Sequence, residues 1–91
     1  MQKRFIIVSK EAGVFLGECL GFFFWSNLDA VGQDSAVTCS TKEEAEKLIK
    51  ENPGAFPMTD LEVREVNVEN LPWATMAECM AAGVPDWIDK M

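Results

Sequence analysis

The sequence contains no histidine and no tyrosine, and only three of its 91 residues are cysteine. Histidine is the most frequent general base and metal ligand in proteins, and only its side chain has an unperturbed pKa near neutrality. The motifs of phosphate-binding loops, dinucleotide-binding folds, nucleophile elbows and zinc proteases are also missing. We therefore expect a protein without enzyme activity, without a cofactor and without a bound metal.

Carboxylates are the one plentiful group that could still support catalysis. Two acidic side chains can work as acid and base when they converge in a cleft and their pKa values differ. The acidic residues in or near the glycine-rich first half are Glu11, Glu18, Asp29 and Asp34. A carboxylate enzyme is therefore the remaining catalytic alternative, and solvated loops are the commoner position for such residues.

Positive charge is scarce. Eight lysines and arginines stand against 15 aspartates and glutamates, which gives a net charge of −7. A surface of this sign repels the phosphate backbone of nucleic acids. We therefore expect a protein partner and no direct nucleic-acid binding.

Long hydrophobic runs are absent as well. The run at residues 5–8 ends at Ser9, and the longer run at residues 12–25 contains Glu18 and three glycines. A signal peptide needs an apolar core of about 7–15 residues after a basic start, and a transmembrane helix needs about 20 apolar residues. We therefore expect a cytoplasmic protein with no membrane partner.

The three cysteines, Cys19, Cys39 and Cys79, are an odd number and form no C-x-x-C pair. Without histidine they do not match a common zinc site. We expect buried free thiols in a reducing compartment. One disulfide or one reactive thiol is the alternative.

The composition is that of one folded domain over residues 1–91. Hydrophobic residues make up 48% of the chain, charged residues make up 25%, and no proline-rich or serine-rich linker divides it. The runs that predict strands are 3–9, 14–18, 22–25, 36–39 and 61–69, and helices are expected at 42–51 and from about 71 onward. The expected fold is α+β, an antiparallel sheet of four to five strands with two helices in the order β-β-β-β-α-β-α.

Both predicted helices have start signals. Ser40 or Thr41 can cap the first helix, because each has a glutamate three residues later. Asn70 can cap the second helix, with Pro72 in its first turn. The residues that would share the apolar face of this second helix are Trp73, Met76, Ala77 and Met80.

The last predicted strand changes its apolar phase in the middle. Leu61 and Val63 share one face, whereas Val66 and Val68 share the other. A β-bulge near Arg64 would bring all four side chains to one face, so we expect a bulge there.

Four large aromatic side chains follow one another at Phe22, Phe23, Phe24 and Trp25. In a strand, two of them point to each face. The second pair therefore needs a cover of its own, or it forms an exposed patch that waits for a partner. The sequence does not indicate which pair is buried.

Glycines precede this run at Gly13, Gly17 and Gly21, one every four residues. In a strand-rich context we expect them at bulges or at positions where two backbones pack closely.

The negative charge is concentrated in the second half of the chain. Residues 1–41 have four acidic and three basic side chains, whereas residues 42–91 have eleven acidic and five basic ones. A negative face would attract a partner with a basic surface, and a role in solubility is the alternative. The residues expected to form this acidic face are Asp60, Glu62, Glu65, Glu69, Glu78 and Asp86.

The segments 5–10, 13–17, 24–26 and 32–38 resemble those of small phage- or prophage-encoded proteins of unknown function, and the resemblance extends over residues 5–50. It implies a phage context, in which small acidic proteins often inhibit host or defence complexes, anti-CRISPR proteins among them. It assigns no binding residue in this chain.

These observations lead to two functional hypotheses. The first is a non-enzymatic protein-interaction module, such as a phage-encoded inhibitor of a host or defence complex, that binds through its acidic surface. The second is a structural or accessory phage protein that forms a homodimer through its Phe/Trp-rich strand.

Overall fold

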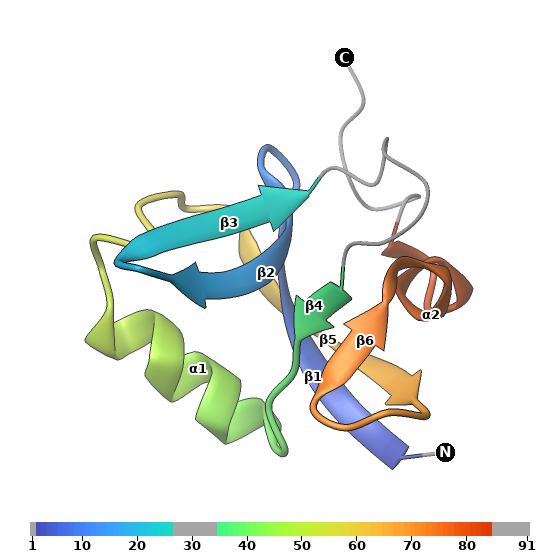
Figure 1. Ribbon diagram of the computed structural model, residues 1–91. Helices are drawn as coiled ribbons and strands as arrows, with labels where there is room; N and C mark the ends of the chain where they lie inside the picture. The colour runs from blue at the N-terminus through green and yellow to red at the C-terminus, as the bar shows by residue number, and fades with distance from the viewer. Residues whose placement is uncertain (1, 27–34, 85–91) are drawn as a thin grey trace.

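The computed structural model describes residues 2–26 and 35–84, which contain six strands and two helices (Figure 1). The strands are β1 (Gln2–Ser9), β2 (Gly13–Cys19), β3 (Phe22–Ser26), β4 (Ser35–Val37), β5 (Leu61–Val68) and β6 (Trp73–Thr75). The helices are α1 (Lys42–Glu51) and α2 (Met76–Ala81). The α+β fold expected from the sequence is confirmed, with a short additional strand, β6, before the last helix.

The strands form two antiparallel sheets. The main sheet has the order β3-β2-β1-β5, and β4 pairs with β6 in a separate two-stranded sheet. After β4 the chain passes along β1, where the backbones of Cys39 and Phe5 exchange hydrogen bonds of 2.8 and 2.9 Å. Figure 1 shows α1 beneath β2 and β3, and shows β4, β6 and α2 grouped beside β1 and β5.

Two hydrophobic cores lie on the two faces of the main sheet. The first core joins the sheet to the β4–β6 pair and α2, and it consists of Ile6, Val8, Val14, Ala36, Val66, Val68, Ala74, Met76, Cys79 and Val84. The second core lies between the sheet, α1 and the segment after α1, and it consists of Ile7, Phe15, Cys39, Ala45, Ala55 and Phe56.

Strand β1 contributes to both cores. Ile6 and Val8 point into the first core, and Ile7 between them points into the second. All three are at most 2% exposed. An uninterrupted apolar run is the expected pattern for a strand that is covered on both faces.

The two cores also explain the phase change in β5, and the bulge expected near Arg64 is wrong. The register between β1 and β5 is unbroken from Gln2 opposite Val68 to Ser9 opposite Leu61. Leu61 and Val63 pack against the second core, whereas Val66 and Val68 belong to the first. Each half of the strand therefore buries its apolar side chains in a different core, and no extra residue is needed.

A bulge does occur in β2, next to a glycine. Phe15 lies opposite Trp25 of β3, and Gly17 lies opposite Phe24, so Leu16 is the extra residue. Gly17 has a φ of 133°, which side chains rarely allow. The expectation that a glycine marks a bulge is confirmed at this position.

Helix α2 begins later than its sequence pattern indicates. Thr75, not Asn70, is its N-cap, and it forms a capping box with Glu78. Trp73 lies in β6, opposite Val37 of β4. The predicted apolar face is therefore wrong, because Met76 is buried while Met80 is 48% exposed. The N-cap of α1 is Thr41, one of the two residues expected there. Its hydroxyl accepts a hydrogen bond from the Glu44 N–H at 3.0 Å.

Candidate functional site: an exposed aromatic hairpin

The β2–β3 hairpin extends beyond the body of the sheet. In register with β1, β2 pairs only at Val14 and Gly13, and the rest of β2 pairs with β3. Leu20 and Gly21 form the two-residue turn, with φ values of 53° and 80°. Positive φ at both turn positions is the geometry that matches the twist of a β-hairpin. The hairpin is therefore a regular element whose tip projects from the sheet.

One face of the hairpin closes the second core. The Phe15 ring lies 5.2 Å from Trp25, 4.9 Å from Phe56 and 6.4 Å from Phe23, centroid to centroid. Trp25 and Phe56 are 5.8 Å apart in an edge-to-face arrangement. Phe23 and Trp25 are thus the pair that faces the protein interior, a choice that the sequence left open.

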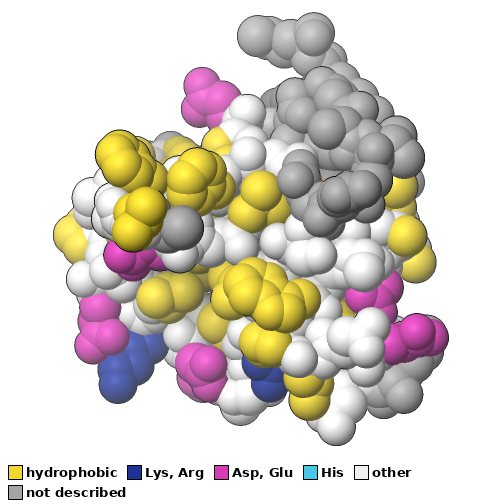
Figure 2. Space-filling model, in the orientation of Figure 1, with side chains coloured by type: hydrophobic (Ala, Val, Ile, Leu, Met, Phe, Trp, Pro, Cys, Tyr) yellow, Lys and Arg dark blue, Asp and Glu magenta, His cyan; other side chains and the backbone are white. Residues whose placement is uncertain are grey.

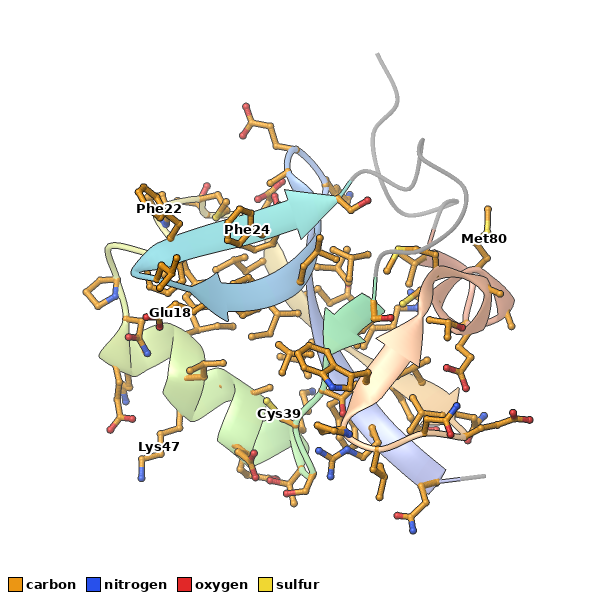
Figure 3. All side chains as sticks on the ribbon, viewed as in Figure 1. Glu18, Phe22, Phe24, Cys39, Lys47 and Met80 are labelled. Atoms are coloured by element: carbon orange, nitrogen blue, oxygen red, sulfur yellow. The ribbon has the colours of Figure 1, made fainter. Side chains whose placement is uncertain are left out.

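The opposite face of β3 is apolar and exposed. Phe22 is 69% exposed and Phe24 is 49% exposed, and Leu20 in the turn is 91% exposed. Figure 2 shows hydrophobic side chains gathered over β3, and Figure 3 shows Phe22 and Phe24 extending from this strand. We call Leu20, Phe22 and Phe24 the hairpin patch.

Strand β3 is also the end strand of the main sheet, with β2 as its neighbour in the described part of the chain. Edge strands in stable monomers are usually protected by lysine, proline or an inward-pointing charge. The segment Phe22–Ser26 contains no charged residue and no proline. Among the described residues, the hairpin patch therefore lies at an end strand that has none of these protections.

Two residues of the expected acidic face serve the fold. The carboxylate of Asp60 accepts the Ser9 hydroxyl at 2.9 Å and the Glu11 N–H at 3.0 Å. The carboxylate of Glu78 accepts the N–H of Thr75 at 2.9 Å and that of Glu69 at 2.8 Å. These bonds hold the β1–β2 turn to the start of β5, and the end of β5 to the start of α2.

The other acidic residues are distributed over several surfaces. Glu62 and Glu65 are exposed and three positions apart on β5, so they point to opposite faces of the sheet. The Glu65 carboxylate lies 3.8 Å from the Lys3 ammonium. Glu69 is exposed and is brought close to Glu78 by the bond from its backbone. Asp86 lies outside the described residues.

A groove between α1 and β5 is a feature that the sequence analysis did not detect. It has a volume of about 620 Å³ and an apolar floor of Ile49, Leu61 and Val63. The charged residues around it are Lys42, Glu46, Lys50 and Glu62. A sequence pattern does not reveal such a groove, because it forms only where a helix packs beside an edge strand.

A shallower depression lies on the outer face of the β4–β6 pair. It has a volume of about 440 Å³ and is lined by Ser35, Asn70, Trp73 and Thr75. Trp73 is 47% exposed. The sequence pattern predicted Trp73 on the apolar face of a helix, so its exposed position in a strand was not predicted.

The buried cysteines are poorly suited to chemistry. Cys39 and Cys79 are free thiols that lie in different cores, so they are not paired with each other. Burial, reinforced by the nearby Glu78 carboxylate, raises the pKa of Cys79 to about 11. Burial also raises the pKa of Cys39, with a further contribution from Glu44. A thiol whose pKa is raised is a weak nucleophile at neutral pH.

The described residues bring together no group that suggests catalysis or metal binding. Within residues 2–26 and 35–84, no three cysteine or acidic side chains cluster closely enough to hold a metal ion. Of the four candidate catalytic carboxylates, Glu11 and Glu18 are exposed, and Asp29 and Asp34 lie outside the described residues. In the same two ranges, no helix is long and apolar enough to cross a membrane.

Comparisons with known proteins add no family. No protein-family model, no curated protein sequence and no solved structure matches the chain. The resemblance to phage proteins therefore stays a prediction.

Proposed function

We propose that this protein is a non-enzymatic protein-interaction module that contacts its partner through the hairpin patch. The observation that supports this proposal is the exposure of Leu20, Phe22 and Phe24 together on and beside the strand that ends the main sheet in the described part of the chain. Contiguous apolar patches of this kind mark interaction surfaces in soluble proteins.

A partner at the hairpin patch would remove apolar side chains from water. Burial of one large apolar side chain contributes about 1.5–3 kcal/mol. Leu20, Phe22 and Phe24 still expose about half or more of their surface, so burial of each would contribute part of this amount, against the entropic cost of association. Aromatic residues near the centre of an interface commonly contribute most of its binding energy. Phe22 and Phe24 are aromatic residues of this kind, and the backbone of their strand would offer hydrogen bonds to a partner.

The acidic surface supports the same function less directly. Asp60 and Glu78 are engaged in hydrogen bonds that hold the fold, and Glu65 is paired with Lys3. Glu62 and Glu69 are the described members of the set that are exposed and have no ion-pair partner among the described residues. An inhibitor that binds a basic host or defence complex through this charge is the second form of the proposal, and the net charge of −7 favours it.

The proposal places the protein in the cytoplasm. The buried free thiols Cys39 and Cys79 support a reducing compartment, where thiols stay unpaired.

A comparison of three bait proteins tests the role of the hairpin patch. The baits are the wild type, a Phe22→Ser/Phe24→Ser variant and a Met80→Ser control, each tagged and incubated with the same lysate, prepared from cells that also express the untagged protein. Met80 is a matched control because it is 48% exposed, close to the 49% of Phe24, but lies on α2. We expect bound proteins that the wild type and the control retain and the double variant loses. Equal retention by all three baits would show that the hairpin patch is not the contact surface.

A further inference from the structure

We infer that the partner of the hairpin patch is a second copy of this chain, with β3 of each copy paired antiparallel across a two-fold axis at Phe24. This inference rests on the proposed function, since it uses the same surface. It specifies the partner, the strand and the register.

The position of β3 in the main sheet favours pairing with a second copy. Within residues 2–26 and 35–84, β3 is the end strand of the order β3-β2-β1-β5, and it carries neither charge nor proline. Antiparallel pairing of two identical end strands satisfies two-fold symmetry, because each strand presents the same edge to the other. Two four-stranded sheets would then form one continuous eight-stranded sheet.

Two-fold symmetry also limits the register in which the two β3 strands can pair. Phe22 and Phe24 point to one face of β3, and Phe23 and Trp25 point to the other. Residues that lie opposite each other across a strand pair share a face, so the register must keep the two sets separate. Centring the pair on Phe24 places Phe24 opposite its symmetry mate and Phe23 opposite Trp25 of the second copy. A shift by one residue would set exposed side chains against core-facing ones.

Pairing of the two β3 strands would cover aromatic side chains on both faces of the sheet. On the exposed face, the two Phe24 rings would cover each other and the neighbouring Phe22 side chains. On the other face, Phe23 is 37% exposed and borders the ring cluster of Phe15, Trp25 and Phe56. Pairing Phe23 with Trp25 of the second copy would continue this cluster across the interface. Aromatic pairs across neighbouring strands stabilise a sheet.

The charge distribution also favours a second copy at the hairpin patch. Two copies that each carry −7 repel each other, so a stable dimer needs a contact region of low charge. Residues 12–26 contain Glu18 as their single charged residue, whereas residues 42–91 carry a net −6. A partner with a basic surface would instead be drawn to that second half. The hairpin patch is therefore the surface that suits a second copy.

The position of Glu18 agrees with this arrangement. Glu18 lies on β2, opposite Phe23, and is thus one strand away from the pairing edge. In the paired sheet, the two Glu18 residues would be separated by three strand spacings, at least about 14 Å at about 4.8 Å each. This distance exceeds the Debye length of about 8 Å at physiological salt, so their repulsion is screened.

The test is the mass of the purified full-length protein in solution, measured by sedimentation velocity and light scattering over a dilution series. We expect a dimer of twice the 10.1 kDa chain mass that dissociates on dilution. Phe24→Glu should raise the dimer dissociation constant at least about 100-fold, because two carboxylates would face each other at the axis. Met80→Glu adds the same charge at a similarly exposed position and should leave the dimer intact.

A charge-swap experiment makes the test specific for the two-fold axis. Phe24→Lys alone should also be monomeric, whereas an equimolar mixture of Phe24→Glu and Phe24→Lys should form a one-to-one heterodimer. Circular dichroism checks that each variant is folded. Phe22→Glu, at the 69% exposed position, replaces Phe24→Glu if that variant does not fold.

The outcomes separate this inference from the proposed function. A wild type that is monomeric at every concentration overturns the second copy as partner, and so does a dimer that Phe24→Glu leaves intact. If the wild type is monomeric and still retains a lysate protein that the Phe22→Ser/Phe24→Ser variant loses, the interaction module stands with a different partner. If retention is also unchanged in that variant, both proposals fail.

Discussion

Thr38 shows how a single buried polar residue can determine where strands form. Its hydroxyl donates to the Pro72 carbonyl at 2.6 Å and accepts from Arg4 Nε at 2.8 Å. Its backbone N–H donates to the same Pro72 carbonyl at 3.0 Å. A buried hydroxyl that lost these partners would cost about 1–3 kcal/mol. Thr38 thus joins the ends of β4 and β6 to β1 and holds Trp73 in a strand.

Cys79 provides a prediction about pH at the same scale. Its pKa is about 11 in the folded protein, compared with an ordinary value of 9.0. Below pH 9 the thiol keeps its proton in both states, and between pH 9 and 11 only the unfolded state loses it. The free energy of unfolding should therefore fall as the pH rises through this range. Urea unfolding of the wild type and of Cys79→Ala, at pH 8 and at several values up to 11, measures the effect.

Comparing the wild type with Cys79→Ala isolates the effect of the Cys79 thiol on the free energy of unfolding, because the lysines titrate in both proteins. We expect the stability advantage of the wild type over Cys79→Ala to shrink with rising pH. An advantage that stayed constant from pH 8 to 11 would contradict the raised pKa.

At the scale of elements, the β2–β3 hairpin combines conformational strain with exposure. Leu20 adopts a φ of 53° in the turn and is 91% exposed. This left-handed conformation costs a residue such as leucine about 1–2 kcal/mol, whereas asparagine tolerates it well. A leucine that is both strained and solvated at a turn gains nothing within the monomer, which agrees with a role in contact with a partner.

The Leu20→Asn substitution should therefore act in opposite directions on two properties. We expect it to raise the free energy of unfolding of the monomer by up to about 1 kcal/mol, because it relieves the strain. We also expect it to weaken association, because it removes an apolar side chain from the hairpin patch. Urea unfolding measures the first effect and sedimentation the second. Unchanged or stronger association would show that Leu20 is not part of the contact.

Elements also show how far sequence patterns predict this fold. The cap of α1 was predicted because its signal is local, a threonine with a glutamate three residues later. The burial of β1 on both faces was predicted because its four apolar residues are consecutive. The start of α2 was predicted too early, because Asn70 and Pro72 give a valid local signal. The contacts of Thr38 with Pro72 override it, and they come from a residue 34 positions away in the chain.

At the scale of the whole molecule, the distribution of charge separates two kinds of partner. The first half of the chain is close to neutral and contains the hairpin patch, whereas residues 42–91 carry most of the net −7. Salt screens repulsion between like-charged copies, and it equally screens attraction to a basic partner. Salt therefore shifts the two associations in opposite directions.

We expect self-association through the hairpin patch to become stronger as the ionic strength rises. Sedimentation of the wild type at low, physiological and high sodium chloride concentrations measures this change, and the Met80→Glu dimer serves as a control with added charge. Self-association that weakened with salt would indicate an interface held by ion pairs, contrary to the proposed pairing of uncharged β3 strands.

The sequence by itself determined the α+β class, the order of the predicted elements and the neutrality of the first half, because hydrophobic period, caps and charge are local properties of the chain. Only the tertiary structure decided which side chains are exposed. Phe23 and Trp25 are turned inward because Phe15 and Phe56 meet them, and Phe22 and Phe24 are left outside.

Tertiary structure also decided which acidic side chains form hydrogen bonds within the fold. No local pattern sets Asp60 apart from Glu62, yet its carboxylate accepts the Glu11 N–H that the fold brings to it, and the Glu78 carboxylate accepts the N–H of Glu69 besides that of Thr75 in its own capping box. A strand pattern gives the face to which a side chain points, but what lies on that face depends on segments far away in the chain. For this protein, that long-range packing left the Phe22 and Phe24 side chains exposed and divided the predicted acidic face among several surfaces.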